Sequence, residues 1–122
     1  MSWLMVALGA GVGAPCRYLV DTTVTARAGA RLPWGTLTVN LLGSLALGVL
    51  AGLALTGEAT PLALSLLGVG FCGAFTTAST FGWEIVALAE DGWPGRAVAY
   101  LALSVVLGLA LAGAALAVVL SI

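Results

Sequence analysis

A run of hydroxyl side chains lies inside one long apolar segment of the chain. Within Gly70–Phe81 the sequence reads Gly-Phe-Cys-Gly-Ala-Phe-Thr-Thr-Ala-Ser-Thr-Phe, with four hydroxyls in five positions. A helix that only crosses a bilayer has no need of such a cluster at its centre. The glycines weaken a helix there, and the hydroxyls can cap one that restarts. We therefore expect a broken helix whose freed groups face something small and charged.

A broken membrane helix offers two kinds of ion site. The start of its second half carries a positive dipole end, which attracts anions. The carbonyls that end its first half can coordinate a small cation. Glu84 lies a turn beyond the cluster, on the same expected half-helix. The alternative is a kinked helix whose hydroxyls bond back to their own carbonyls.

The composition restricts the class of protein. Of the 122 residues, 61% are hydrophobic and only 7% are charged, whereas a soluble domain carries about 25% charged residues. The chain is therefore expected to be an integral membrane protein. Its net charge of −1 includes no basic stripe for nucleic acid. It has no histidine, the commonest general base and metal ligand, which counts against an enzyme.

Four segments are apolar enough and long enough to cross a bilayer, which takes roughly 20 helical residues. They cover about 3–23, 34–55, 61–89 and 94–120. The connections between them are short, so neighbouring helices must run antiparallel. We expect one all-α membrane domain of four transmembrane helices, with the third helix broken at its centre.

The arginines indicate how the chain lies in the plasma (inner) membrane. The side of the membrane that loops one and three share carries Arg27, Arg31 and Arg96, and the other side carries no arginine or lysine. Positive charge collects on the cytoplasmic side. We therefore expect loops one and three in the cytoplasm and both termini outside.

Other polar side chains lie at bilayer depth, where they are costly and usually functional. Arg17 and Asp21 have the spacing of a helical ion pair, although Arg17 can also snorkel to the interface. Asn40 is flanked by apolar residues and is either a link between helices or a donor facing a pore. Tyr100 and Ser104 share one face of the fourth span, which is a weak signal alone.

Small residues recur every four positions in three of the spans. They form the faces Gly9-x-x-x-Gly13, Ser44-x-x-x-Gly48-x-x-x-Gly52 and Ser104-x-x-x-Gly108-x-x-x-Ala112. Such faces let helix backbones approach closely in lipid. They predict tight packing, within the chain or between chains, and indicate no particular function.

Three segments together resemble the signatures of the Fluc (CrcB) fluoride channel family. They are Gly-Ala-Gly-Val-Gly-Ala-Pro-Cys-Arg-Tyr at 9–18, Gly-Thr-Leu-Thr-Val-Asn-Leu-Leu-Gly-Ser at 35–44, and the 70–81 segment. The order of these segments, the length and the four spans fit along the whole chain. The resemblance implies a passive fluoride exporter, built as an antiparallel dimer with two pores and a buried structural Na⁺.

The resemblance also implies roles for single positions. The backbone carbonyls of Gly73 and Thr76 would hold the Na⁺, two from each subunit. Asn40 would donate to fluoride, and Phe81 would present its positive ring edge to the ion. Arg17 would be an inner structural or electrostatic residue. The remaining pore positions would be Ser79, Thr80 and Ser104, with Tyr100 near a pore end.

One position departs from the family pattern Thr-Thr-Phe-Ser-Thr-Phe. The first phenylalanine is Ala78 here, so a homodimer would lose one kind of ring edge from both pores. Together with the arginine bias, this suggests a second Fluc-type subunit as the partner. The alternative is a homodimer that tolerates Ala78.

Two other functions fit the size and the number of spans. A small multidrug-resistance-type antiporter needs a carboxylate deep in the first span, but residues 3–20 contain none and Asp21 lies at its end. A non-conducting assembly subunit would leave Asn40 and the hydroxyl cluster unexplained. Fluoride release that needs no proton gradient would separate a channel from both.

Overall fold

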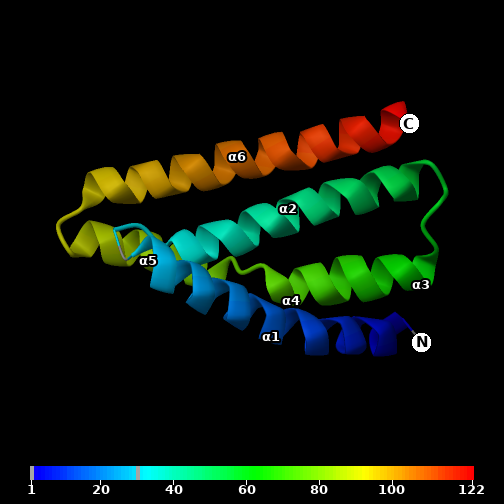
Figure 1. Cartoon of the computed structure of the whole chain (residues 1–122), viewed down its shortest axis with the longest axis horizontal. Coiled ribbons are helices and arrows are strands. Elements are labelled where there is room, and N and C mark those ends of the chain that lie inside the picture. Colours follow the sequence, from blue (N-terminus) through cyan, green and yellow to red (C-terminus); the bar gives the residue numbers. More distant parts are fainter. Residues whose placement is uncertain (1, 30) are drawn as a thin grey trace.

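The protein is all-helical in the computed structural model, which describes residues 2–29 and 31–122. Helix α1 runs over Ser2–Ala28, α2 over Trp34–Leu55 and α6 over Pro94–Ser121. The third transmembrane segment, here called the third passage, comprises α3 (Pro61–Ala63), the π-helix η1 (Leu64–Cys72), α4 (Gly73–Phe75) and α5 (Ser79–Glu90). All four passages of the described chain are long and apolar enough to cross a membrane (Figure 1).

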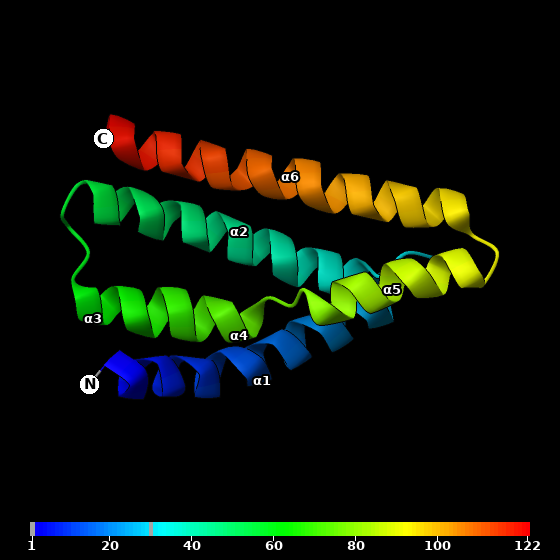
Figure 2. The same ribbon diagram turned by 180° about the vertical axis from the view of Figure 1, so that it is seen from behind.

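Consecutive passages run in opposite directions, as short connections between long helices require. α1 and the third passage run one way, while α2 and α6 run the other (Figures 1 and 2). Both termini and the connection between α2 and α3 lie at one end of the bundle. The connections that follow α1 and α5 lie at the other end, where Arg31 and Arg96 are found.

The first helix is longer than expected. It continues to Ala28, five residues beyond the predicted end at Thr23. Nothing in this stretch interrupts a helix before Gly29, whose φ of +86° suits a residue that follows a helix end. Arg27 therefore belongs to the last turn of α1 and not to a loop, where a cation interacts favourably with the helix dipole.

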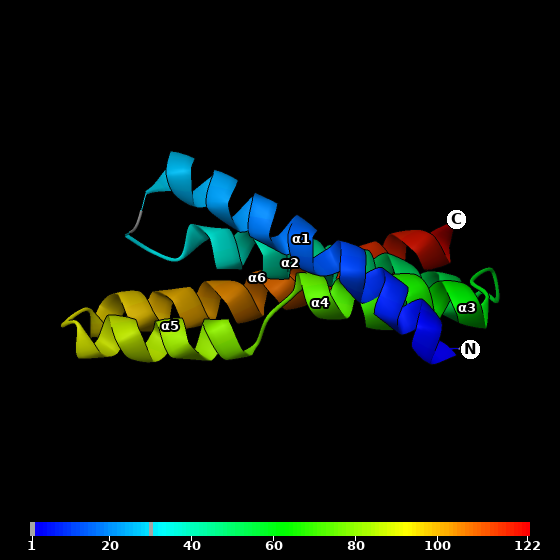
Figure 3. The same ribbon diagram turned by 90° about the horizontal axis from the view of Figure 1, so that it is seen from below.

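The third passage is broken, as the sequence predicts. Helix α4 ends at Phe75 and α5 begins at Ser79, with an extended link between them (Figure 3). The two halves pack against different helices: η1 and α4 lie along α1, whereas α5 lies along α6. At the break, near the centre of the bundle, the chain therefore leaves α1 and begins to pack against α6.

The winding of the first half was not predicted. Leu64–Cys72 forms a π-helix of nine residues, directly before the break. Such winding is rare, and it is commonly found at functional sites. Its N–H groups bind carbonyls five residues earlier rather than four, a difference that the hydrophobic pattern does not encode.

A first seam of small residues joins α1 to η1. A Cβ on Gly9 would overlap the Leu66 carbonyl, and one on Gly13 would overlap the Phe71 carbonyl. From the other side, a Cβ on Gly70 would meet the backbone of α1 at 2.6 Å. Because only glycine allows backbones to approach so closely, the Gly9-x-x-x-Gly13 face packs within the chain.

A second seam joins the parallel helices α2 and α6. A Cβ on Gly48 would overlap the backbone at Ala112, and one on Gly52 would meet an α6 side chain at 2.7 Å. A Cβ on Gly108 would lie 3.3 Å from the Ser44 hydroxyl. The two small-residue faces predicted for the second and fourth spans therefore pack against each other.

Few large side chains are enclosed by the single chain. Tyr100, Val39 and Cys72 are the largest ones that are fully buried. Many leucines and valines face outward, among them Leu109 at 71% exposure and Val69 at 65%. Such outward apolar surface suits lipid or a further subunit, not water.

Candidate functional site

The break begins at Thr76. The Thr76 N–H still makes the regular helical bond to the Cys72 carbonyl, at 3.0 Å. The Thr76 hydroxyl donates to the same carbonyl at 2.8 Å. The backbone of Thr76 is then extended, with φ −87° and ψ 164°. This hydroxyl follows the alternative considered from sequence, a hydroxyl bonded back to its own helix.

Asn40 binds the next residue from another helix. The Thr77 N–H donates to Asn40 Oδ1 at 2.9 Å, and Asn40 Nδ2 donates to the Thr77 carbonyl at 3.1 Å. The side-chain amide therefore satisfies both backbone groups of Thr77. In a continuous α-helix the Thr77 N–H would bind the Gly73 carbonyl instead. The bond to Asn40 leaves that carbonyl without its regular donor.

The second half of the helix starts with a hydroxyl cap. The Thr80 N–H donates to the Thr77 hydroxyl at 3.3 Å, which satisfies one of the free donors at the start of α5. Thr77 thus uses its backbone to hold the break and its side chain to begin the next helix. Ser79 and Thr80 are themselves exposed in the single chain.

A cavity of about 260 Å³ opens beside the break. Its lining comes from α2, the link and α5, and includes no charged side chain. The lining residues are Asn40, Ser44, Leu47, Thr76, Thr77, Ala78 and Phe81. Four residues that were given individual roles from the sequence therefore meet at one cavity: Asn40, Thr76, Ala78 and Phe81.

Tyr100 connects the aromatic and acidic residues of α5. Its ring meets that of Phe81 edge-on, with centroids 5.1 Å apart and an interplanar angle of 69°. Its hydroxyl donates to Glu84 Oε1 at 3.0 Å. Tyr100 is fully buried and is the seventh residue of α6. It fixes the position of Phe81 and Glu84 relative to α6.

Ser104 lies one turn beyond Tyr100 on α6. Its hydroxyl is the only buried side-chain polar atom of the described residues that has no hydrogen-bond partner. A buried polar group without a partner costs about 1–3 kcal/mol. The hydroxyl is therefore available to a ligand or to a group from another chain.

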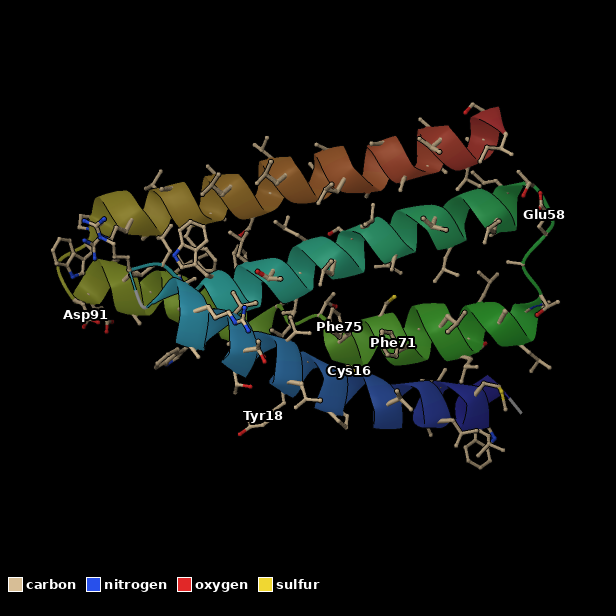
Figure 4. The ribbon with its side chains drawn as sticks, in the orientation of Figure 1. Cys16, Tyr18, Glu58, Phe71, Phe75 and Asp91 are labelled. Atoms are coloured by element: carbon tan, nitrogen blue, oxygen red, sulfur yellow. The ribbon has the colours of Figure 1, made fainter. Side chains whose placement is uncertain are left out.

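Phe75 does not share this environment. It is buried and stacks on Phe71, with ring centroids 5.5 Å apart and planes 13° apart. Figure 4 shows the two rings next to each other along the third passage. Of the two phenylalanines near the break, only Phe81 lines the cavity.

The ion pair expected between Arg17 and Asp21 does not form. The Asp21 carboxylate instead accepts a hydrogen bond from the Thr25 hydroxyl at 3.3 Å. It lies against the start of α2, where a Cβ on Gly35 would overlap it. The contact with α2 turns Asp21 away from Arg17, and Arg17 is half-buried on α1.

Part of this site was not found from the sequence. The pattern singled out Asn40 as an expensive amide, but a sequence does not show which backbone groups it binds 37 positions away. The bond from Tyr100 to Glu84 was also missed. Its only signal was a tyrosine and an acid at similar depth in consecutive spans.

Comparison with known proteins places the chain in a family. The model of the CrcB-like proteins, described as camphor resistance (CrcB), matches residues 4–116. The chain belongs to the CrcB/FluC family. This family consists of fluoride channels and not of enzymes.

Several curated CrcB/FluC proteins are similar along most of their length. "Fluoride-specific ion channel FluC 1" of Streptomyces avermitilis is 49% identical over 109 residues, covering 89% of this chain and 88% of the relative. "Fluoride-specific ion channel FluC 1" of Frankia casuarinae is 48% identical over 124 residues, covering 96% of both. "Fluoride-specific ion channel FluC 2" of Mycobacterium tuberculosis is 48% identical over 110 residues, covering 90% and 84%.

Proposed function

We propose that this chain is a subunit of a fluoride-selective channel that lets cytoplasmic fluoride leave the cell passively. The observation that carries the proposal is the broken third helix, bound by Asn40 beside a cavity that is lined by an amide, hydroxyls and apolar side chains and by no charged group. About 48% identity to fluoride-specific ion channels over most of the chain supports it.

The cavity has the chemistry that a fluoride path needs. Fluoride is small and strongly hydrated, so a pore has to replace its water shell with close donors yet release the ion again. Asn40 keeps one N–H that is not used by Thr77, because its amide has two. The ring edge of Phe81 carries partial positive charge. The cavity lining contains no fixed positive charge, which would trap the ion.

Hydroxyl groups extend this path beyond the cavity. Ser79 and Thr80 are exposed at the start of α5, where the helix dipole favours an anion. Ser104 offers a buried hydroxyl that has no partner in the described chain. Tyr100 contacts the Phe81 ring and donates a hydrogen bond to Glu84, and it thereby holds both side chains in place. In this proposal Arg17 and Glu84 act through structure and electrostatics.

The carbonyls of Gly73 and Thr76 fit a structural Na⁺. Hard cations prefer oxygen ligands, including backbone carbonyls, and half-helix ends supply such ligands in membrane transport proteins. The Gly73 carbonyl lacks its regular helical donor, since Thr77 binds Asn40. Gly73 is also exposed in the single chain, which is compatible with a site shared with another subunit. A bound Na⁺ would add positive potential near the anion path.

The proposed assembly is an antiparallel dimer with two pores. The outward apolar side chains and the exposed Gly73 support a partner at the break. Ala78 lines the cavity, so the ring that the family pattern has at this position is missing from this subunit. The partner is either a second copy or a different Fluc-type subunit that supplies that ring. The end of the bundle that carries Arg27, Arg31 and Arg96 is proposed to be cytoplasmic.

Fluoride release from liposomes tests the proposal. The purified chain is reconstituted alone, and release is followed with a fluoride electrode, with and without a proton gradient. A channel gives rapid, electrogenic release in both conditions and little chloride release. Release that requires a proton gradient would indicate the antiporter, and no release by any assembled form would indicate an assembly subunit. Robust release by the single chain would exclude an obligate partner of different sequence.

A further inference from the structure

We infer that Asn40 is the residue that keeps the third helix open, and that it thereby positions the Gly73 carbonyl for a cation. The inference rests on the cation site proposed above and adds a positioning residue from another helix. Asn40 does not have to touch the cation in this role. It acts by holding the Thr77 N–H away from the Gly73 carbonyl.

The hydrogen bonds show where regular winding stops. The Thr76 N–H still binds the carbonyl four residues earlier, that of Cys72. The next N–H, that of Thr77, would bind Gly73 if the helix continued. It binds Asn40 Oδ1 at 2.9 Å instead. Thr77 is therefore the first residue at which the regular helical bond is lost, and it is the residue that Asn40 binds.

The amide of Asn40 lowers the cost of opening the helix by binding both backbone groups of Thr77. A backbone N–H or carbonyl left without a partner in hydrocarbon is strongly unfavourable. Asn40 accepts from the Thr77 N–H and donates to the Thr77 carbonyl, so neither group is orphaned. An apolar side chain at position 40 would leave both unpaired, and closure onto Gly73 would then be favoured.

The same amide faces the anion cavity. Nδ2 carries two hydrogens, of which one binds the Thr77 carbonyl at 3.1 Å. Asn40 also lines the cavity beside the break. One side chain thus links the proposed anion path to the proposed cation site, and the two roles can be separated by substitution.

The test measures Na⁺-dependent stability of the purified, assembled protein. Melting is compared in NaCl and in N-methyl-D-glucamine chloride, beside fluoride release from liposomes. The wild type is expected to melt at higher temperature with Na⁺. Asn40→Ala is expected to lose this shift, or to need at least about tenfold more Na⁺ for it, and to lose fluoride release.

Two further variants separate the roles of Asn40. Thr77→Pro in the Asn40→Ala background removes the N–H that would close the helix, and the extended Thr76 backbone suits a following proline. This double variant is expected to regain the Na⁺ shift without regaining fluoride release. Asn40→Asp keeps an acceptor for the Thr77 N–H, so it is expected to keep the Na⁺ shift and lose fluoride release.

A matched control lies on the same helix. The Thr38 hydroxyl binds only its own helix, at the Trp34 carbonyl, so Thr38→Ala is expected to keep both the Na⁺ shift and fluoride release.

An undiminished Na⁺ shift in Asn40→Ala would overturn the inference and leave the channel proposal standing. Loss of the Na⁺ shift in Asn40→Asp would also overturn the inference. A wild type without any Na⁺ shift would overturn the cation site and this inference together. If Asn40→Ala does not fold, recovery of folded protein with Thr77→Pro supports the inference, and failure of Asn40→Asp to fold as well contradicts it.

Discussion

The two halves of the third passage are held in different ways. The first half, η1 and α4, lies against α1 through glycines that bring the two backbones together. The second half, α5, is held on α6 by side chains: Tyr100 binds Glu84 and its ring meets Phe81. Backbone contacts at glycine leave no freedom of adjustment, whereas side-chain contacts can be tuned one at a time. The first half is therefore suited to fixing carbonyl positions, and the second to lining a path for an ion.

The largest effect is expected at the seam of the first half. Gly9→Val places methyl groups where the Leu66 carbonyl lies, so α1 has to separate from η1. Overpacking of this kind costs about 3 kcal/mol or more, and we expect little folded protein by size-exclusion chromatography in detergent. Gly11→Val is the matched control, since a Cβ on Gly11 meets nothing within 4 Å. Equal yields of the two variants would show that the α1–η1 seam is not rigid.

A smaller effect is expected where α5 is held by side chains. Tyr100→Phe keeps the ring against Phe81 but removes the donor to Glu84. A lost hydrogen bond to a charged or half-buried group costs about 1–3 kcal/mol, so melting temperature and fluoride release should both fall. Tyr18→Phe is the control, since Tyr18 is 68% exposed and points away from the bundle (Figure 4). A loss of the same size in both would contradict the role given to Tyr100.

Substitution of Ala78 tests, without disturbing the fold, whether the residues next to α5 line a path for the ion. Ala78 is exposed and lines the cavity, so Ala78→Phe adds a ring edge with a change in stability within about 0.5 kcal/mol. We expect faster fluoride release by the single chain in liposomes. Ala110→Phe on exposed α6 surface should leave the rate unchanged. An unchanged rate for Ala78→Phe would mean that position 78 does not face the ion path.

The smallest stability effect is expected at Ser104. Its hydroxyl has no partner in the described chain, so Ser104→Ala removes a group that is costly to bury. We expect no decrease in the free energy of unfolding, while fluoride release falls. Ser121→Ala, which removes a hydroxyl bonded to its own helix, should change neither. A clear loss of stability in Ser104→Ala would show that the hydroxyl has a structural partner.

The sequence predicted the four helical passages and the broken third helix, and it singled out some of the residues that line the cavity. These features follow from local patterns: apolar length, glycines, and hydroxyls where a spanning helix has no use for them. It did not predict the π-helix before the break or the longer α1. The absent Arg17–Asp21 pair and the partners of Asn40 and Tyr100 were missed as well. Except for the end of α1, which follows from the local position of Gly29, these features depend on contacts between helices far apart in the sequence, which periodicity along one helix does not encode.

Measuring the contact between Thr77 and Asn40 tests most directly how the break in the third helix is held. Asn40 is the only asparagine in the chain, so asparagine labelled with ¹³C at Cγ gives one carbon signal. Solid-state NMR in lipid bilayers can measure its dipolar coupling to the Thr77 amide nitrogen, which lies 2.9 Å from Asn40 Oδ1. We predict a strong coupling from Thr77 to Asn40 Cγ. A strong coupling from Thr77 to the Gly73 carbonyl carbon, with none to Asn40 Cγ, would contradict the account.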